Sequence, residues 1–195
     1  MLVRESADLD EWERLERHLH SRTMSLREVL AAQAALIRCS LSEADELLAG
    51  ATTFDTTFAR FVKRCAQDRV ALTVLSSGIG PLIERAFERN GLYRIALLAN
   101  GVTPDSTGWQ MNFRDGSDNG HDKARAVKFA QHIGNTVAYI GDGYSDFDAA
   151  LAADIRFAKR GRSLERHLIA LREPFTPFDR FSEIEAQLFP EPLRQ

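Results

Sequence analysis

The sequence predicts an α/β protein in which helices cover both faces of a parallel sheet and a small helical lobe is attached. Two observations support this class. Residues 9–49 carry helical patterns and no strand-like run, whereas from about residue 54 helices alternate with short apolar runs rich in β-branched residues. Such alternation is typical of parallel sheets buried on both faces. We therefore expect a helical cap at residues 1–50 and an α/β core at residues 51–195.

Composition and charge restrict the class of function. A chain of 195 residues, 44% of them hydrophobic, is long and apolar enough to bury a core of its own. The formal net charge of -3 argues against nucleic-acid or membrane partners. The sequence contains no apolar signal core and no stretch near the roughly 20 apolar residues that span a bilayer. We expect a cytoplasmic protein in which Cys39 and Cys65 are buried, reduced thiols.

The helical lobe contains two or three predicted helices. Ser25-Leu26-Arg27-Glu28 has the capping-box pattern, in which the serine and glutamate side chains satisfy free amides at a helix start. Ser42 is expected to open another short helix that ends at Gly50.

The core is predicted as short strands that alternate with helices. Strands are expected at residues 70–75, 95–99, 136–140 and 155–158, and helices at 54–65, 79–87, 121–133, 145–153 and 182–188. Asn90-Gly91 should end its helix in the left-handed conformation. Residues 100–120 are rich in Gly, Asp, Asn and Ser, which predicts a hairpin with arms centred on Val102 and on residues 109–113.

Two acids follow the buried strand at residues 137–140. That strand ends in Gly141 and leads through Asp142 and Gly143 to Asp146. Ligands of open α/β sheets bind beyond the carboxyl ends of the strands, and carboxylates suit Mg²⁺. The glycines would let the backbone turn sharply. Alternatively both acids only cap the next helix, which explains Asp146 better than Asp142, because an acid directly after a buried strand loses solvation.

Two other segments fit a bound phosphate. Ser76-Ser77-Gly78 follows an apolar strand and opens a helix, where a hydroxyl and free amides can hold an anion, although an ordinary helix cap explains it equally well. Lys123 begins the helix before the Asp142 strand, where its charge opposes the helix dipole. It could balance a phosphate, and a solvated surface lysine is the simpler alternative.

In this order the segments resemble the haloacid-dehalogenase superfamily, and within it the phosphoserine-phosphatase-like branch that includes methylthiopentenyl-phosphate and phosphocholine or phosphoethanolamine phosphatases. The resemblance rests on the helical lobe and on the segments at residues 74–78, 122–124, 141–146 and 152–159. It implies a HAD-like fold and a Mg²⁺-dependent phosphatase that acts through an aspartyl-phosphate on a small phosphorylated metabolite.

The resemblance also implies roles for individual residues. By position, Ser76, Ser77, Gly78 and Lys123 would bind the phosphoryl group. Asp142 would ligate Mg²⁺, and Asp146 would also belong to the metal site, either behind the direct ligands or acting through a water. Lys123 and Asp146 would be the catalytic residues that the sequence retains.

The family's first motif, a central apolar strand that ends in Asp-x-Asp and supplies the nucleophile, is missing. Asp8-Leu9-Asp10 follows no apolar strand and is interpreted as a helix cap, and Asp146-Phe147-Asp148 belongs to the later motif. We therefore expect this chain to be inactive, through a truncated reading frame or a natural loss. The strands at residues 70–75 and 136–140 should then pair directly or leave unpaired backbone.

Other classes of function remain to be compared. The alternative to the enzyme is a non-catalytic phosphate-binding or interaction protein of the same fold, and a phospho-acceptor signalling domain lacks its acceptor aspartate. The histidines show no metal-ligand spacing, so no zinc is expected; they are His18, His20, His121, His132 and His167.

Overall fold

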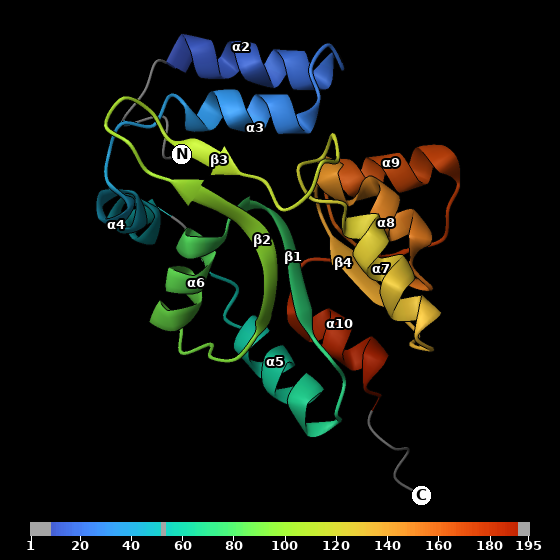
Figure 1. The fold of residues 1–195 in the computed structure, drawn as a ribbon. Helices are drawn as coiled ribbons and strands as arrows, with labels where there is room; N and C mark the ends of the chain where they lie inside the picture. Colours follow the sequence, from blue (N-terminus) through green and yellow to red (C-terminus); the bar gives the residue numbers. More distant parts are fainter. Residues whose placement is uncertain (1–8, 52–53, 191–195) are drawn as a thin grey trace, which may run out of the picture. The chain divides into compact units, whose positions relative to one another are not determined.

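The computed structural model describes residues 9–51 and 54–190, which fold into two compact units. The first unit combines the described residues before Phe54 with Thr73–Asp122, and the second combines Phe54–Leu72 with the described residues from Lys123 onward. Each unit carries a three-stranded sheet (Figure 1). The predicted α/β class, with parallel strands and flanking helices, is confirmed.

Three helices of the first unit come from the predicted helical lobe: α2 (Leu9–His20), α3 (Leu26–Ala34) and α4 (Leu41–Ala51). The capping box is confirmed, because the Ser25 hydroxyl accepts the Glu28 amide and the Ser25 amide donates to the Glu28 carboxylate. The predicted start of α4 is wrong by two residues. Ser40, not Ser42, exchanges these hydrogen bonds with Glu43.

The sheet of the first unit is built from β1 (Thr73–Ile79), β2 (Ala96–Thr103) and β3 (Gln110–Asn112), with α6 (Gly80–Arg89) between the first two strands. β1 and β2 are parallel, and β2 and β3 form the predicted hairpin, in which Val102 lies opposite Met111. Gly91 has the predicted left-handed conformation, with φ 67°.

The prediction that β1 begins at Val70 is wrong. The Val70 amide still bonds to the Cys65 carbonyl at the end of the preceding helix, after Arg69 has adopted a left-handed φ of 57°. Val70 is 47% exposed, so this β-branched residue belongs to the helix end and the strand starts at Thr73.

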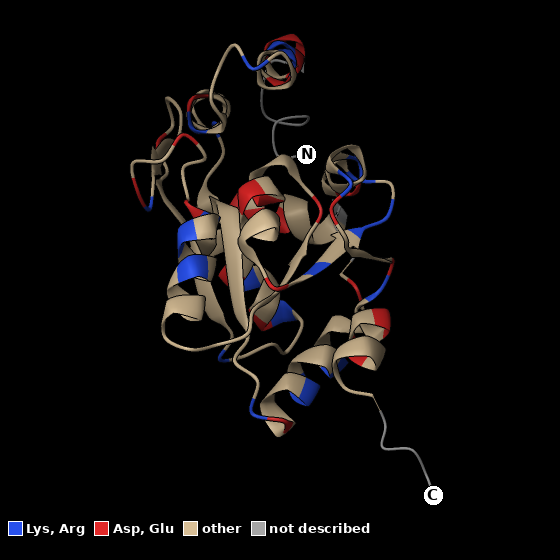
Figure 2. Cartoon of the chain, turned by 90° about the vertical axis from the view of Figure 1, so that its right-hand side faces the viewer, with Lys and Arg blue, Asp and Glu red and all other residues tan. Residues whose placement is uncertain are grey.

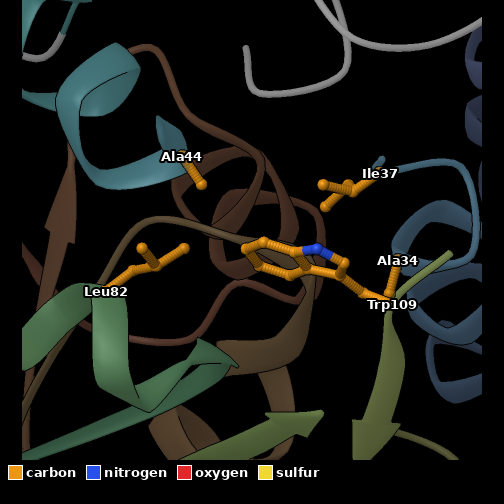
Figure 3. Packing of buried hydrophobic residues seen from close by; sticks show 5 residues of the cluster. All are labelled: Ala34, Ile37, Ala44, Leu82 and Trp109. Carbon is orange, nitrogen blue, oxygen red and sulfur yellow. The ribbon is translucent and has the colours of Figure 1, made fainter. Parts of the chain in front are cut away.

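A hydrophobic cluster joins the helices of the first unit to its hairpin (Figure 3). Trp109 is 1% exposed and lies among Ala34, Ile37, Ala44 and Leu82. Its indole N–H donates to the Cys39 carbonyl over 2.8 Å, and its amide bonds to the Ala34 carbonyl. The tryptophan therefore fixes the segment that follows α3 against β3.

The second unit contains five α-helices, a 3₁₀ turn and three strands within the described residues. They are α5 (Phe58–Gln67), α7 (Lys123–His132), β4 (Ala138–Gly141), η1 (Tyr144–Asp146), α8 (Phe147–Ala152), β5 (Ile155–Lys159), α9 (Ser163–Leu171), β6 (Thr176–Phe178) and α10 (Phe181–Leu188). The three strands are parallel, in the order β4-β5-β6. α8 packs against β4 and β5, and α9 packs against β5.

Two elements of this unit, α9 and β6, were not predicted. β6 contains Pro177, which donates no backbone hydrogen bond and normally excludes a segment from a sheet. The strand is tolerated because it is the outermost of its sheet and pairs only with β5 within the described chain.

The absence of the family's first strand predicted that β1 and β4 either pair directly or leave unpaired backbone. In the described residues β1 pairs with β2, and β4 pairs with β5, so each is the terminal strand of its own sheet. The tripeptide at residues 8–10 lies partly outside the described residues, and only Leu9 and Asp10 are seen, at the start of α2.

Charged residues of both signs are interspersed on the helices and loops, and the strands are largely uncharged (Figure 2). Among the described residues no helix is long and apolar enough to cross a membrane. Both cysteines are free; Cys65 is buried, and burial raises the pKa of its thiol, whereas Cys39 is only partly buried.

Candidate active site

The strand β4 ends directly at the acidic turn that was predicted from sequence. Asp142 follows the last strand residue, and Asp146 closes the 3₁₀ turn just before α8. Gly141 is required at the strand end because a Cβ there would lie 2.9 Å from the Asp146 carboxyl group. The reason differs from the expected sharp turn, since neither Gly141 nor Gly143 has a positive φ.

Lys123 and Asp146 form a buried ion pair. The Lys123 Nζ lies 2.7 Å from Asp146 Oδ1 and donates over 2.8 Å to the Ser145 hydroxyl. Lys123 is 6% exposed, so the solvated surface lysine that was considered from sequence is wrong. A buried ammonium carries three donors, and only two have partners within the described part of the chain.

The Asp146 carboxylate accepts four hydrogen bonds. Oδ1 receives Lys123 Nζ and the Tyr139 hydroxyl, and Oδ2 receives the amides of Asp142 and Gly143 at 2.9 Å each. Burial opposes the charged form and is the largest single influence on this carboxyl. The Lys123 charge and the hydrogen bonds together outweigh it and lower the pKa of Asp146.

Tyr139 was missed as a functional residue because it was counted as part of an apolar strand. Its hydroxyl is buried in β4 and donates to Asp146 Oδ1 over 2.8 Å. Burial, followed by the charge of Asp146, raises the pKa of this phenol, so it stays a neutral donor. The available signal was chemical: a buried tyrosine hydroxyl needs a partner, and Asp146 is the acid nearest along the chain after Asp142.

Asp142 presents its carboxylate to solvent. Its backbone is fixed, because the amide donates to Asp146 and the carbonyl accepts the Leu164 amide. In the described residues its carboxylate makes no hydrogen bond or ion pair, so it does not cap the helix. One free carboxylate on a fixed turn fits Mg²⁺, which takes few protein ligands and keeps several waters. No group of three metal-ligating side chains occurs among the residues described.

Ser76, Ser77 and Gly78 lie at the end of β1 in the first unit. The pairing of β1 with β2 shifts register between Leu75 and Ile79, so these three residues form an irregularity at the strand end. Helix α6 begins two residues later than Gly78, with Ile79 as its N-cap. The Ser76 hydroxyl accepts the Gly78 amide over 3.0 Å, which already uses one amide expected to face a phosphate.

The Ser77 side chain is buried, and its hydroxyl makes no hydrogen bond in the part of the chain described. The surrounding backbone is well held, since Asn100 donates to the Ser77 carbonyl and His121 Nδ1 lies 3.1 Å from the Ser76 carbonyl. A buried hydroxyl without a partner is unfavourable. It suits an added acceptor such as a phosphate oxygen.

The predicted site residues thus fall into two groups. Lys123, Asp142 and Asp146 come together in the second unit, around the end of β4. Ser76, Ser77 and Gly78 come together in the first unit, at the end of β1. Both groups occupy the carboxyl ends of parallel strands, where α/β proteins bind ligands.

A fold and a site of this kind define an α/β protein with a ligand site at the carboxyl ends of its parallel strands, formed in part by an acidic turn and a buried lysine. The chain belongs to the haloacid dehalogenase-like hydrolase family, whose model matches residues 4–151. Two curated relatives are each 28% identical: Pdp3-interacting factor 1 of Schizosaccharomyces pombe and the polyol phosphate phosphatase PYP1 of Saccharomyces cerevisiae. Each alignment covers 85% of this chain, and 76% and 75% of the respective relative.

Solved structures show the same fold. A substrate-bound phosphoserine phosphatase superposes with a TM-score of 0.70 at 14% identity, over 95% of this chain and 88% of the other. A phosphoserine phosphohydrolase-like protein from Francisella tularensis has a TM-score of 0.65 at 18% identity, over 93% and 85%. The predicted superfamily and the phosphoserine-phosphatase-like fold are therefore confirmed.

Proposed function

We propose that the protein is a Mg²⁺-dependent phosphomonoester hydrolase that acts on a small phosphorylated metabolite. One observation carries the proposal. Lys123 is buried, pairs with Asp146 and keeps one N–H donor without a partner in the described part of the chain, and it lies beside a turn whose Asp142 carboxylate has no partner there either. The charge of the lysine would attract a phosphoryl oxygen, and the carboxylate would hold the metal. When bound, Mg²⁺ would neutralise negative charge on the phosphoryl group.

Each residue has a separate part in this proposal. Asp146 would pair with Lys123 and hold the Asp142 backbone in place, and it would act on the metal through this backbone or a water. Its oxygens already accept four donors, which leaves little capacity for direct ligation. On the first unit, Ser76, Ser77 and Gly78 would bind phosphate. The Ser77 hydroxyl supports this role, because it is buried and has no hydrogen-bond partner within residues 9–51 and 54–190.

The curated relatives direct the choice of substrates. Since one relative is named a polyol phosphate phosphatase, we place polyol phosphates first among the candidate substrates, ahead of phosphoserine. Cytoplasmic location, and the division into a cap at residues 1–50 and a core at 51–195, stay predictions.

A non-catalytic phosphate-binding protein is the second candidate. It is favoured by the two carboxylates of the acidic turn, because Asp146 is committed to Lys123 and Tyr139, which leaves Asp142 as the one of the two without a partner among the residues described. No attacking carboxylate is assigned among the described residues, so binding without turnover is chemically sufficient for this set of side chains.

Phosphate release from polyol phosphates, phosphoserine and para-nitrophenyl phosphate, with Mg²⁺ or with a chelator, separates these candidates. The inactivity expected from the missing Asp-x-Asp motif stays a prediction. If the chain does release phosphate, release should require Mg²⁺, and Asp142→Asn should abolish it. Asp148→Asn should leave it unchanged, since Asp148 is an exposed acid in the first turn of α8. Binding of phosphate or vanadate without turnover would support the second candidate. A chain that neither binds phosphate nor releases it would contradict both.

A further inference from the structure

The phenol of Tyr139 lies at one end of a continuous chain of hydrogen bonds. Its hydroxyl donates to Asp146 Oδ1 over 2.8 Å, and the other carboxylate oxygen, Oδ2, receives the amides of Asp142 and Gly143. Tyr139 belongs to β4, whose backbone is paired residue by residue with β5. The hydroxyl is therefore supplied from a rigid strand.

We infer that Tyr139 is a positioning residue, whose hydroxyl orients the Asp146 carboxylate and thereby holds the turn that presents Asp142. This inference rests on the proposed function, in which the turn at Asp142 holds Mg²⁺. It adds a residue that was taken as part of an apolar strand.

The need for a second donor follows from the geometry of the carboxylate. Lys123 reaches Asp146 Oδ1 through a long, flexible side chain. The ammonium therefore balances the carboxylate charge but fixes the orientation of the carboxylate less well. A phenol has only two side-chain torsions, and its hydroxyl adds a donor of fixed direction to the same oxygen. Because both the ammonium and the phenol hydroxyl donate to Oδ1, the other oxygen, Oδ2, faces the amides of Asp142 and Gly143.

The burial of the hydroxyl argues against simple packing. Phenylalanine would fill the same space in β4 without placing a polar group in the interior, which is unfavourable unless the group is hydrogen-bonded. The Tyr139 hydroxyl has one partner among the described residues, and that partner is the acid of the site.

The test compares Tyr139→Phe with Tyr93→Phe, the same change at an exposed residue of the first unit. Amide hydrogen exchange is measured in the full chain by NMR. Loss of one hydrogen bond from the chain should speed exchange at Asp142 and Gly143 by roughly fivefold. The amide of Ala153, the C-cap residue of α8, bonds to helix carbonyls and should exchange at an unchanged rate. Unchanged exchange at Asp142 and Gly143 would overturn the inference.

Mg²⁺ titration by calorimetry supplies the second measurement. Because residues behind a metal ligand typically contribute 10–100-fold to metal affinity, Tyr139→Phe should weaken Mg²⁺ binding by about tenfold and Tyr93→Phe should not change it. If Tyr139 only packs in the strand, Tyr139→Phe should alter thermal stability and leave the Mg²⁺ affinity unchanged. That result would overturn the inference. If the wild type binds no Mg²⁺, the proposed function fails, and the exchange data still decide the role of Tyr139.

A measurement on the wild type covers the case in which Tyr139→Phe does not fold. The hydroxyl proton of Tyr139 should exchange slowly enough to be seen by NMR, with a nuclear Overhauser contact to the Asp146 methylene. Absence of that contact in the folded protein would also overturn the inference.

Discussion

The ends of β1 and β4 each carry a buried polar group, and the two groups differ in how many hydrogen bonds they make. At the end of β4, Asp146 accepts four hydrogen bonds and pairs with a buried lysine. At the end of β1, the Ser77 hydroxyl is buried and makes none among the residues described. The first group is complete without a ligand, whereas the second lacks an acceptor.

The difference indicates how the two strand ends are built. A saturated carboxylate contributes to stability and holds its surroundings in one geometry before any ligand arrives. An unpartnered hydroxyl reduces stability and leaves a donor for a ligand. Stability variants should therefore respond in opposite directions at the two strand ends.

Asp146→Ala should have the largest effect. Removal of one partner leaves the Lys123 charge buried and unpaired, which typically lowers the free energy of unfolding by about 3–5 kcal/mol. Urea unfolding measures it, with the exposed Asp148→Ala as the matched control. The double variant Lys123→Met/Asp146→Leu should lose less than the single variant. A double variant that is no better than Asp146→Ala would show that the pair matters for more than its charge balance.

The same carboxylate predicts a loss of stability in acid. Because the folded-state pKa of Asp146 is lowered, its contribution is fully present above the unfolded-state pKa, near pH 4, and is lost as pH falls through the folded-state pKa. The free energy of unfolding should decline more steeply below about pH 4 in the wild type than in Asp146→Asn. Equal slopes would mean that Asp146 titrates normally in the folded protein.

Gly141→Ala should be destabilising by about 1–3 kcal/mol, since the new Cβ would lie 2.9 Å from the Asp146 side chain and force it to move. Gly143→Ala is the matched control, because its Cβ would meet nothing closer than 3.7 Å and its φ of -110° suits alanine. Thermal denaturation of both variants measures the difference. Similar melting temperatures would show that Asp146 adapts easily.

Two serines at the end of β1 should respond with opposite signs. Ser77→Ala removes a buried hydroxyl that has no partner in the described structure, and it should raise the free energy of unfolding by about 1 kcal/mol. Ser76→Ala removes the acceptor of the Gly78 amide and should lower the free energy of unfolding by about 1 kcal/mol. Phosphate affinity, measured by calorimetry, should fall for Ser77→Ala. A destabilised Ser77→Ala would show that its hydroxyl has a partner in solution.

The features that could be predicted from the sequence are those set by local chemistry. The Ser25 capping box, the left-handed Gly91 and the Val102–Met111 hairpin depend on residues close in sequence. The acidic turn after β4 could be predicted from the order of Gly141, Asp142 and Asp146 along the chain, because ligands of α/β sheets bind beyond the carboxyl ends of the strands. Its role as a metal or phosphate site stays a prediction.

Contacts between distant residues limited the rest of the prediction. Lys123 was predicted as a site residue only through the resemblance, and a solvated surface lysine was the simpler alternative from its position. A helix start does not reveal that the lysine pairs with Asp146, 23 residues away. β6 was missed because Pro177 opposes strand formation locally and only the pairing with β5 overrides it. That the Ser77 hydroxyl lacks a hydrogen-bond partner among the described residues could not be predicted from the sequence, because hydrogen-bond partners are set by the folded structure.

The buried Trp109 has a practical consequence for all of these measurements. The chain contains two tryptophans, Trp12 and Trp109, and both lie in the first unit. Tryptophan fluorescence, excited selectively so that the tyrosines do not contribute, therefore reports on that unit alone, and circular dichroism reports on the helices of both. If the two signals change at different urea concentrations, the units unfold independently; if they coincide, the protein unfolds as one cooperative body.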